Sequence, residues 1–248
     1  MFKVECLKTN NMTKRIIPDT ITCCNLLCGS VAVYMATQHA FIWAFLLILG
    51  GAFFDFFDGL SARALKAPSK IGIELDSLAD DITFGLAPSM MVACYLMPVI
   101  GWWALIALIM AAFSALRLAK FNVDERQTSS FIGLATPANA IFWGSVCCMP
   151  YAITAPVWMP WVMLGLTLIS SYLLISEVPF FSLKFKNFTW RENYDKYTFL
   201  IGALVLIVFC VVRGILAHHV EFILFSGAAV IVWYVVINYV ANLIKPKN

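Results

Sequence analysis

Charged residues are scarce in this sequence of 248 residues: 12% are Asp, Glu, Lys or Arg, whereas 62% are hydrophobic. Soluble domains contain about 25% charged and about 45–50% apolar residues, so the composition excludes an ordinary soluble protein. It indicates a membrane protein that crosses the bilayer several times. The small net charge of +3 gives no indication of nucleic-acid binding and is typical of basic loops that face anionic lipid headgroups.

Two other features are missing. No C-x-x-C pair occurs among the eight cysteines, and no histidine lies near them in the sequence. Neither a disulfide framework nor a zinc site is therefore predicted. Residues 1–15 lack the continuous apolar core of a signal peptide. They are expected to form a basic segment on the cytoplasmic surface of the membrane.

Long apolar segments occupy most of the chain. About 20 apolar residues are needed to cross the hydrocarbon core as a helix. Eight segments meet this measure, at residues 17–36, 40–64, 73–97, 101–121, 136–154, 157–176, 197–216 and 220–242. The sequence therefore predicts an all-α bundle of eight transmembrane helices, formed by a single domain over residues 16–242 and followed by a cytoplasmic tail at 243–248.

Basic residues indicate the orientation of these helices. They cluster at both ends of the chain and in alternate connections, at Lys3, Lys8, Lys14, Arg15, Arg63, Lys66, Lys70, Arg117, Lys120, Arg126, Lys184, Lys186, Arg191, Lys196, Lys245 and Lys247. Loops rich in Lys and Arg remain in the cytoplasm. Both termini are therefore expected on the cytoplasmic side, and an even number of helices fits this alternation.

Four aspartates lie close together in otherwise apolar sequence. Asp55 and Asp58 are three residues apart, so they share one face of a helix. Asp76 and Asp80 are four residues apart on the next predicted helix and share a face in the same way. A charge at the centre of a membrane helix costs about 2.5–3.5 kcal/mol, so a compensating cation is expected. Divalent cations prefer oxygen ligands, and a pair of them can stabilise both the attacking and the leaving oxygen of a phosphoryl transfer.

The stretch from Asp55 to Asp80 reads D-x2-D-G-x2-A-R-x8-G-x3-D-x3-D. It resembles the signature of the CDP-alcohol phosphotransferases, integral membrane enzymes of phospholipid synthesis, at every fixed position. The resemblance implies that Asp55, Asp58, Asp76 and Asp80 bind two divalent cations, Mg²⁺ or Mn²⁺, and that Asp80 is also the catalytic general base. It further implies that the CDP group lies against Asp19, Thr22, Gly59, Ala62, Arg63, Ser69 and Gly72.

A second match lies at the start of the first apolar segment, where Pro18 to Gly29 read P-D-x2-T-x2-N-x3-G. Family members often carry Asn at the position of Asp19. A carboxylate cannot donate a hydrogen bond as an amide does, so Asp19 is interpreted either as a nucleotide contact or as a helix N-cap. Thr22 is the stronger candidate for a nucleotide contact.

The signature does not identify the acceptor alcohol. The stretches ALRLAKFN at residues 115–122 and FIGLATPANA at residues 131–140 resemble membrane-type phosphatidylserine synthases. This resemblance implies CDP-diacylglycerol and L-serine as substrates, a homodimer, and a bacterial inner membrane with the site facing the cytoplasm. The candidates for holding serine are Arg117, Lys120 and Asn139. Arg117 or Lys120 would pair with the serine carboxylate, or would instead extend to lipid headgroups.

Two alternatives remain open at this point. A sister enzyme could use glycerol 3-phosphate or an inositol phosphate, although such an acceptor should require more cationic side chains than these two. A divalent-cation transporter would also contain carboxylates within the membrane. Its ligands, however, would be expected near the middle of the bilayer rather than at one membrane face.

Overall fold

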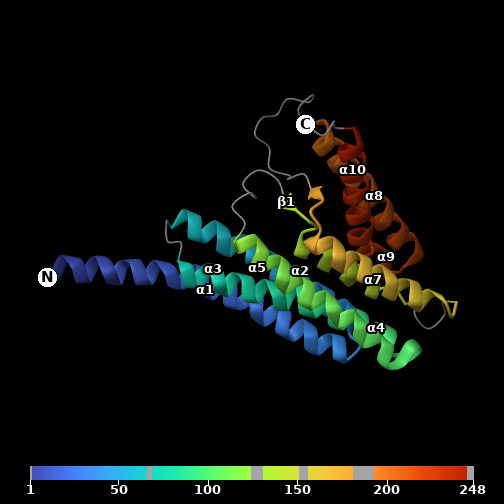
Figure 1. Cartoon of the computed structure of the whole chain (residues 1–248), viewed down its shortest axis with the longest axis horizontal. Helices are drawn as coiled ribbons and strands as arrows, with labels where there is room; N and C mark the ends of the chain where they lie inside the picture. The colour runs from blue at the N-terminus through green and yellow to red at the C-terminus, as the bar shows by residue number, and fades with distance from the viewer. Residues whose placement is uncertain (1, 66–68, 124–130, 151–155, 181–192, 245–248) are drawn as a thin grey trace.

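The structure, a computed structural model, describes all residues except 1, 66–68, 124–130, 151–155, 181–192 and 245–248; of residues 2–15, 131 and 244 it describes the backbone alone. The described part is almost entirely helical, as predicted (Figure 1). Its stretches that are long and apolar enough to cross a membrane are Ile16–Thr37, Phe41–Ala64, Lys70–Val123, Tyr194–Ala217 and Val220–Leu243. The chain is therefore an integral membrane protein, and the count of eight spans stays a prediction.

The first two helices form an antiparallel hairpin. Helix α1 (Phe2–Thr37) and helix α2 (Phe41–Ala64) pack along each other, and the N-terminal part of α1 extends beyond the bundle (Figure 1). The span predicted at 17–36 is the apolar part of α1. The helix continues through Pro18, although a proline lacks the amide hydrogen for the usual backbone bond. Asp19 consequently lies in the interior of α1, and the N-cap interpretation is wrong.

A continuous helical run of 54 residues follows. It consists of α3 (Lys70–Asp80), the π-helical turn η1 (Asp81–Leu86), α4 (Ala87–Ile100), the 3₁₀ segment η2 (Gly101–Leu108) and α5 (Ile109–Val123). The chain reverses at Gly101, whose φ of +58° is a conformation that glycine adopts without strain. Helix α5 returns along η1, so this run contains the predicted third and fourth segments.

Two shorter helices and a small ladder come next. Strands β1 (Phe131–Ile132) and β2 (Pro179–Phe180) pair antiparallel, with Phe131 opposite Phe180. Between them lie α6 (Thr136–Cys147) and α7 (Met159–Ile175). The fifth segment was predicted to extend to residue 154, but α6 ends at Cys147 and a turn follows. Residues 151–155 lie outside the described part.

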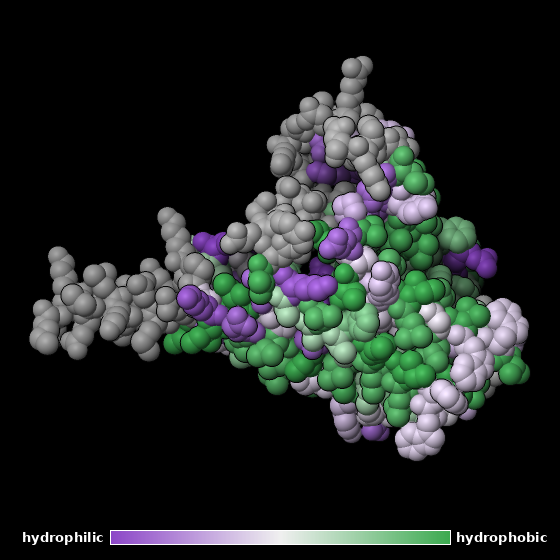
Figure 2. Space-filling view, in the orientation of Figure 1, coloured by the Kyte–Doolittle hydropathy of each residue, from purple (hydrophilic) through white to green (hydrophobic). Residues whose placement is uncertain are grey.

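The C-terminal helices α8 (Tyr194–Ala217), α9 (Val220–Leu224) and α10 (Ser226–Ile244) form a second hairpin, which stands at a steep angle to α1–α5 (Figure 1). Helix α10 connects it to the bundle by packing against α6. Hydrophobic residues cover most of the visible face. Hydrophilic ones gather at the end where α3 begins and α5 ends (Figure 2).

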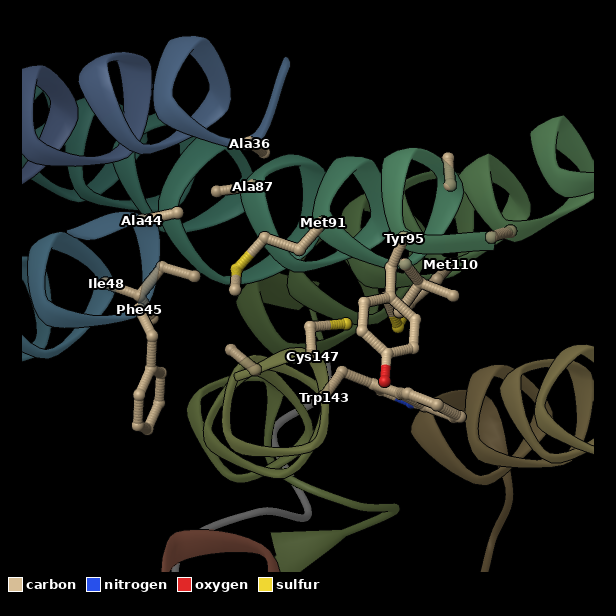
Figure 3. Close-up of a cluster of buried hydrophobic side chains, with 14 of the residues drawn as sticks. Ala36, Ala44, Phe45, Ile48, Ala87, Met91, Tyr95, Met110, Trp143 and Cys147 are labelled. Atoms are coloured by element: carbon tan, nitrogen blue, oxygen red, sulfur yellow. The ribbon is translucent and has the colours of Figure 1, made fainter. Parts of the chain in front are cut away.

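The core lies around α4, which packs against α1, α2 and α6 (Figure 3). Tyr95 of α4 lies beside Trp143 of α6, and Met91 of α4 and Phe45 of α2 are buried in the same core (Figure 3). Two polar groups of this core have hydrogen-bond partners: the Tyr95 hydroxyl donates to the Met149 carbonyl oxygen at 2.6 Å, and Trp143 Nε1 donates to Ser170 Oγ at 2.9 Å. This core holds α1, α2 and the helical run from α3 to α4 against one another. Helices α2 and α3 carry the four aspartates of the predicted metal site.

Candidate metal and nucleotide site

The signature aspartates converge where α2 faces α3. One carboxylate oxygen from each of Asp55, Asp76 and Asp80 lies within 4.8 Å of the other two. At this separation two ionised carboxylates repel by about 3–4 kcal/mol at an effective dielectric constant of about 20. Asp76 Oδ1 is buried and has no hydrogen-bond partner among the described residues. The cluster therefore requires a positive charge.

No direct ion pair in the described ranges supplies that charge. Among these residues no lysine or arginine nitrogen lies within 4.0 Å of a carboxylate oxygen of this cluster, and the buried Arg117 acts on Asp80 from farther away. Three convergent oxygen ligands without a cationic side chain fit a hard divalent cation. The cluster of Asp55, Asp76 and Asp80 could therefore bind a metal ion.

Asp58 lies beside this cluster, one turn after Asp55 on α2. Its side chain is only 6% exposed, and its charge is close enough to act on Asp55 and Asp76. The Thr22 hydroxyl of α1 donates to Asp58 Oδ2 at 2.7 Å. Asp58 lines a neighbouring pocket together with Asp76 of the cluster.

That pocket, of about 160 Å³, lies between α1, the end of α2 and the start of α3. Six of the seven residues predicted to contact CDP line it, namely Asp19, Thr22, Gly59, Ala62, Ser69 and Gly72. The seventh, Arg63, is exposed, and its Nε donates to the Gly59 carbonyl oxygen of its own helix at 2.9 Å. The structure therefore places most of the predicted nucleotide contacts together, next to the aspartates.

The floor of the pocket is the N-terminus of α3. Ser69 caps this helix, and its Oγ accepts a hydrogen bond from the Gly72 amide at 2.9 Å. A Cβ at Gly72 would lie 3.0 Å from Ser69 Oγ and 3.2 Å from Asp19 Oδ1. Glycine at this position thus keeps the helix terminus open, and helix N-termini favour anionic groups such as phosphates.

The three predicted acceptor residues lie in different environments. Arg117 on α5 is only 8% exposed, and its charge interacts with that of Asp80. Its Nη1 donates to Thr136 Oγ1 at 3.2 Å, whereas its Nε has no partner in the described part of the chain. Asn139 is 1% exposed, and its Nδ2 lies 2.9 Å from Met110 Sδ. Lys120, by contrast, is exposed.

One residue of the site was not assigned a role from the sequence. Asn25 of α1 donates from Nδ2 to Asp80 Oδ1 at 3.0 Å. It is three residues after Thr22, so both side chains lie on one face of α1. That spacing was a signal for placing Asn25 at the same site as Thr22.

Comparison with known proteins agrees with this geometry. Residues 15–180 match the family described as CDP-alcohol phosphatidyltransferase. The chain is 40% identical to the CDP-diacylglycerol–serine O-phosphatidyltransferase of Bacillus subtilis over 168 residues, which are 66% of this chain and 89% of that protein. It is 34% identical to the enzyme of the same name from Helicobacter pylori over 51% of this chain and 54% of that protein. The Mycobacterium tuberculosis enzyme of this name is 26% identical over 92% of this chain and 77% of its own length.

Proposed function

Because the chain belongs to the CDP-alcohol phosphatidyltransferase family, we propose that it transfers the phosphatidyl group of CDP-diacylglycerol to L-serine and releases CMP. The names of the similar bacterial enzymes support this reaction. The cluster of carboxylates and the pocket beside it support this reaction independently. The acyl chains of the donor would stay in the lipid, because the pocket opens at the hydrophilic end of the bundle.

The aspartates would organise the donor. Asp55, Asp58, Asp76 and Asp80 would hold two divalent cations, Mg²⁺ or Mn²⁺, next to the pocket that receives CDP. Bound there, the cations would neutralise the pyrophosphate and stabilise the charge of the departing CMP. The glycines at positions 59 and 72 would let the phosphates approach the helix backbones.

Asp80 would act as the general base. It lies at the junction of α3 and η1, and it is the aspartate whose charge interacts with Arg117. A carboxylate oxygen of Asp80 would take the proton of the serine hydroxyl as the serine oxygen attacks the β-phosphorus. The bond between this phosphorus and the CMP oxygen would break, so that phosphatidylserine and CMP form.

Arg117 would bind the serine carboxylate. The burial of this arginine, with an unpartnered Nε, is the observation that favours serine as acceptor. A buried guanidinium without an ionic partner is costly, and a carboxylate can accept two hydrogen bonds from it. The free Nε of Arg117 and its interaction with Asp80 support this placement. Asn139 would contribute to the same region, whereas the exposed Lys120 would contribute less. A doubly charged phosphate acceptor would require more than this one buried cation.

The proposal extends to the arrangement in the membrane. The eight helical segments would all cross the bilayer, with both termini and the aspartates on the cytoplasmic side, as the alternation of basic residues indicates. The Bacillus and Helicobacter relatives are bacterial, which supports a location in a bacterial inner membrane. The protein would function as a homodimer.

Release of CMP by the purified full-length protein tests this proposal. With CDP-diacylglycerol and Mn²⁺, we expect rapid release in the presence of L-serine and little with glycerol 3-phosphate or an inositol phosphate. Ethanolamine, which lacks the carboxylate, should also be a poor acceptor. Faster release with a phosphate acceptor would overturn the choice of serine, and Mn²⁺ flux into liposomes without any CMP release would overturn the transferase.

A further inference from the structure

Helix α1 contacts one carboxylate on each of the two helices that carry the aspartates. Thr22 Oγ1 donates to Asp58 Oδ2 of α2 at 2.7 Å, and Asn25 Nδ2 donates to Asp80 Oδ1 at the end of α3 at 3.0 Å. Thr22 is 3% exposed and Asn25 is fully buried. Both donors therefore act on their carboxylates where solvent has little or no access.

Each donor faces its carboxylate. A hydroxyl has one hydrogen to donate. Of the two acceptors within reach of Thr22 Oγ1, the carboxylate oxygen Asp58 Oδ2 at 2.7 Å is nearer than the Pro18 carbonyl oxygen at 3.1 Å, so the hydrogen points to Asp58. Turning the Asn25 amide over would set its oxygen against an ionised Asp80. Its nitrogen must therefore face the carboxylate.

Close packing around Thr83 fixes the position of Asn25 relative to Asp80. Thr83, in the π-helical turn after Asp80, donates from Oγ1 to the backbone oxygen of Asn25 at 3.0 Å. A Cβ at Gly29 would lie 2.7 Å from Thr83 Cα, and a Cβ at Gly51 would lie 2.8 Å from Asn25 Oδ1. These two glycines let α1 and α2 close around Thr83, so Asn25 and Asp80 have little freedom to separate.

We propose that Thr22 and Asn25 are positioning residues that orient Asp58 and Asp80 for metal binding and for proton transfer, rather than contacts of the nucleotide. Each hydrogen bond engages one oxygen of its carboxylate and so restricts the rotation of that carboxylate. Such partners behind metal ligands set the direction of the ligand. This inference rests on the proposed role of the aspartates as metal ligands.

Calorimetric titration of the purified full-length protein with Mn²⁺ in the absence of substrate, together with the kinetics of CMP release, separates positioning from nucleotide binding. In Thr22→Val, which keeps the shape and removes the donor, we expect the half-saturating Mn²⁺ concentration to rise roughly 10- to 100-fold. The KM for CDP-diacylglycerol at saturating Mn²⁺ should change by less than about threefold, because no nucleotide contact is lost. Thr22→Ser, which restores a hydroxyl, should recover most of the Mn²⁺ affinity.

Asn25→Leu should lower kcat roughly 10- to 100-fold, because Asp80 loses its orienting donor, with little change in the KM for CDP-diacylglycerol. Asn25→Ala, which cannot overfill the site, should give the same separation of kcat from KM and serves if the leucine variant does not fold. Thr20→Val is the matched control, because Thr20 lies on the same helix and its hydroxyl donates to its own backbone, to the Ile16 carbonyl oxygen. It should behave as wild type.

Two results would overturn the inference: a raised KM for CDP-diacylglycerol with unchanged Mn²⁺ dependence and kcat, or a Thr22→Ser variant as defective as Thr22→Val. Asp58→Asn distinguishes this failure from failure of the proposed function. If Asp58→Asn keeps the wild-type Mn²⁺ dependence, the metal-binding role of Asp58 is wrong. If Asp58→Asn changes the Mn²⁺ dependence while the Thr22 and Asn25 variants keep the wild-type Mn²⁺ dependence and kcat, only the positioning role is wrong.

Discussion

Adjacent glycines on α2 allow the packing at the site to be tested without touching an aspartate. Gly51 faces α1 and η1, where a Cβ would contact the Thr83 methyl group and lie 2.8 Å from Asn25 Oδ1. Gly50 is next in sequence, and the nearest atom to a Cβ there is Cys28 Sγ at 3.8 Å, an ordinary contact. We predict that Gly51→Ala damages the protein and that Gly50→Ala does not.

The expected magnitudes follow from this difference. Forcing a methyl group into a packed interior costs about 1–3 kcal/mol, and replacing a helical glycine by alanine returns about 0.5–1 kcal/mol. Gly51→Ala should therefore lose about 1–2 kcal/mol of stability, and each kcal/mol corresponds to about 2–4 °C in Tm for a chain of this size. Displacement of Asn25 and Thr83 by about 1 Å should also reduce kcat by up to about 100-fold.

Thermal unfolding in detergent and the rate of CMP release measure the two effects. Gly50→Ala should unfold at the wild-type temperature or slightly above it, with wild-type activity. Equal losses in the two variants would show that any methyl group on this part of α2 is harmful. A fully active and stable Gly51→Ala would contradict the close contact of α1, α2 and η1.

Further predictions concern the chemistry. Asp80→Asn should abolish turnover while CDP-diacylglycerol still binds in the presence of Mn²⁺, and near-normal activity would exclude Asp80 as the base. Arg117→Met should raise the KM for serine about 30-fold or more, since loss of one partner of a buried charged pair costs about 2–5 kcal/mol. Lys120→Met, at an exposed position, is its control and should change this KM little. The rate should fall at low pH because protons compete with cations for the carboxylates; an acid limb that does not move to lower pH when Mn²⁺ is raised tenfold would contradict this.

Helix spacing was sufficient to predict the aspartate pairs, and the family resemblance predicted most of the residues that line the pocket. The spacing of Asp55 and Asp58, and of Asp76 and Asp80, fixes which side chains share a helix face, and this depends only on the geometry of a single helix. Because few residues connect α2 to α3, the two pairs of aspartates must lie at the same end of neighbouring helices. Sequence alone does not distinguish Gly51, where a Cβ would lie 2.8 Å from Asn25 Oδ1, from Gly50, where a Cβ would meet Cys28 Sγ at an ordinary 3.8 Å.

Contacts between distant parts of the chain were harder to predict. The bond between Asn25 and Asp80 joins residues 55 positions apart, and no periodicity within either helix specifies it. Arg117 and Lys120 are three residues apart on α5, so their pattern alone gives them similar roles. Only the packing of α5 against η1 and α7 makes one of them buried and the other exposed.

The order of the elements along the chain has a consequence for how the protein is made. The carboxylate cluster, the pocket and both donors on α1 come from residues 18–80 of a chain of 248. Membrane domains that emerge first from the ribosome can begin to assemble first. The cation-binding end can thus form while the last hairpin, α8–α10, is still being synthesised. That hairpin lies beyond the family match, which ends at residue 180, yet its Tyr234 interacts with Arg117, so the environment of this arginine is complete only once the last hairpin has packed.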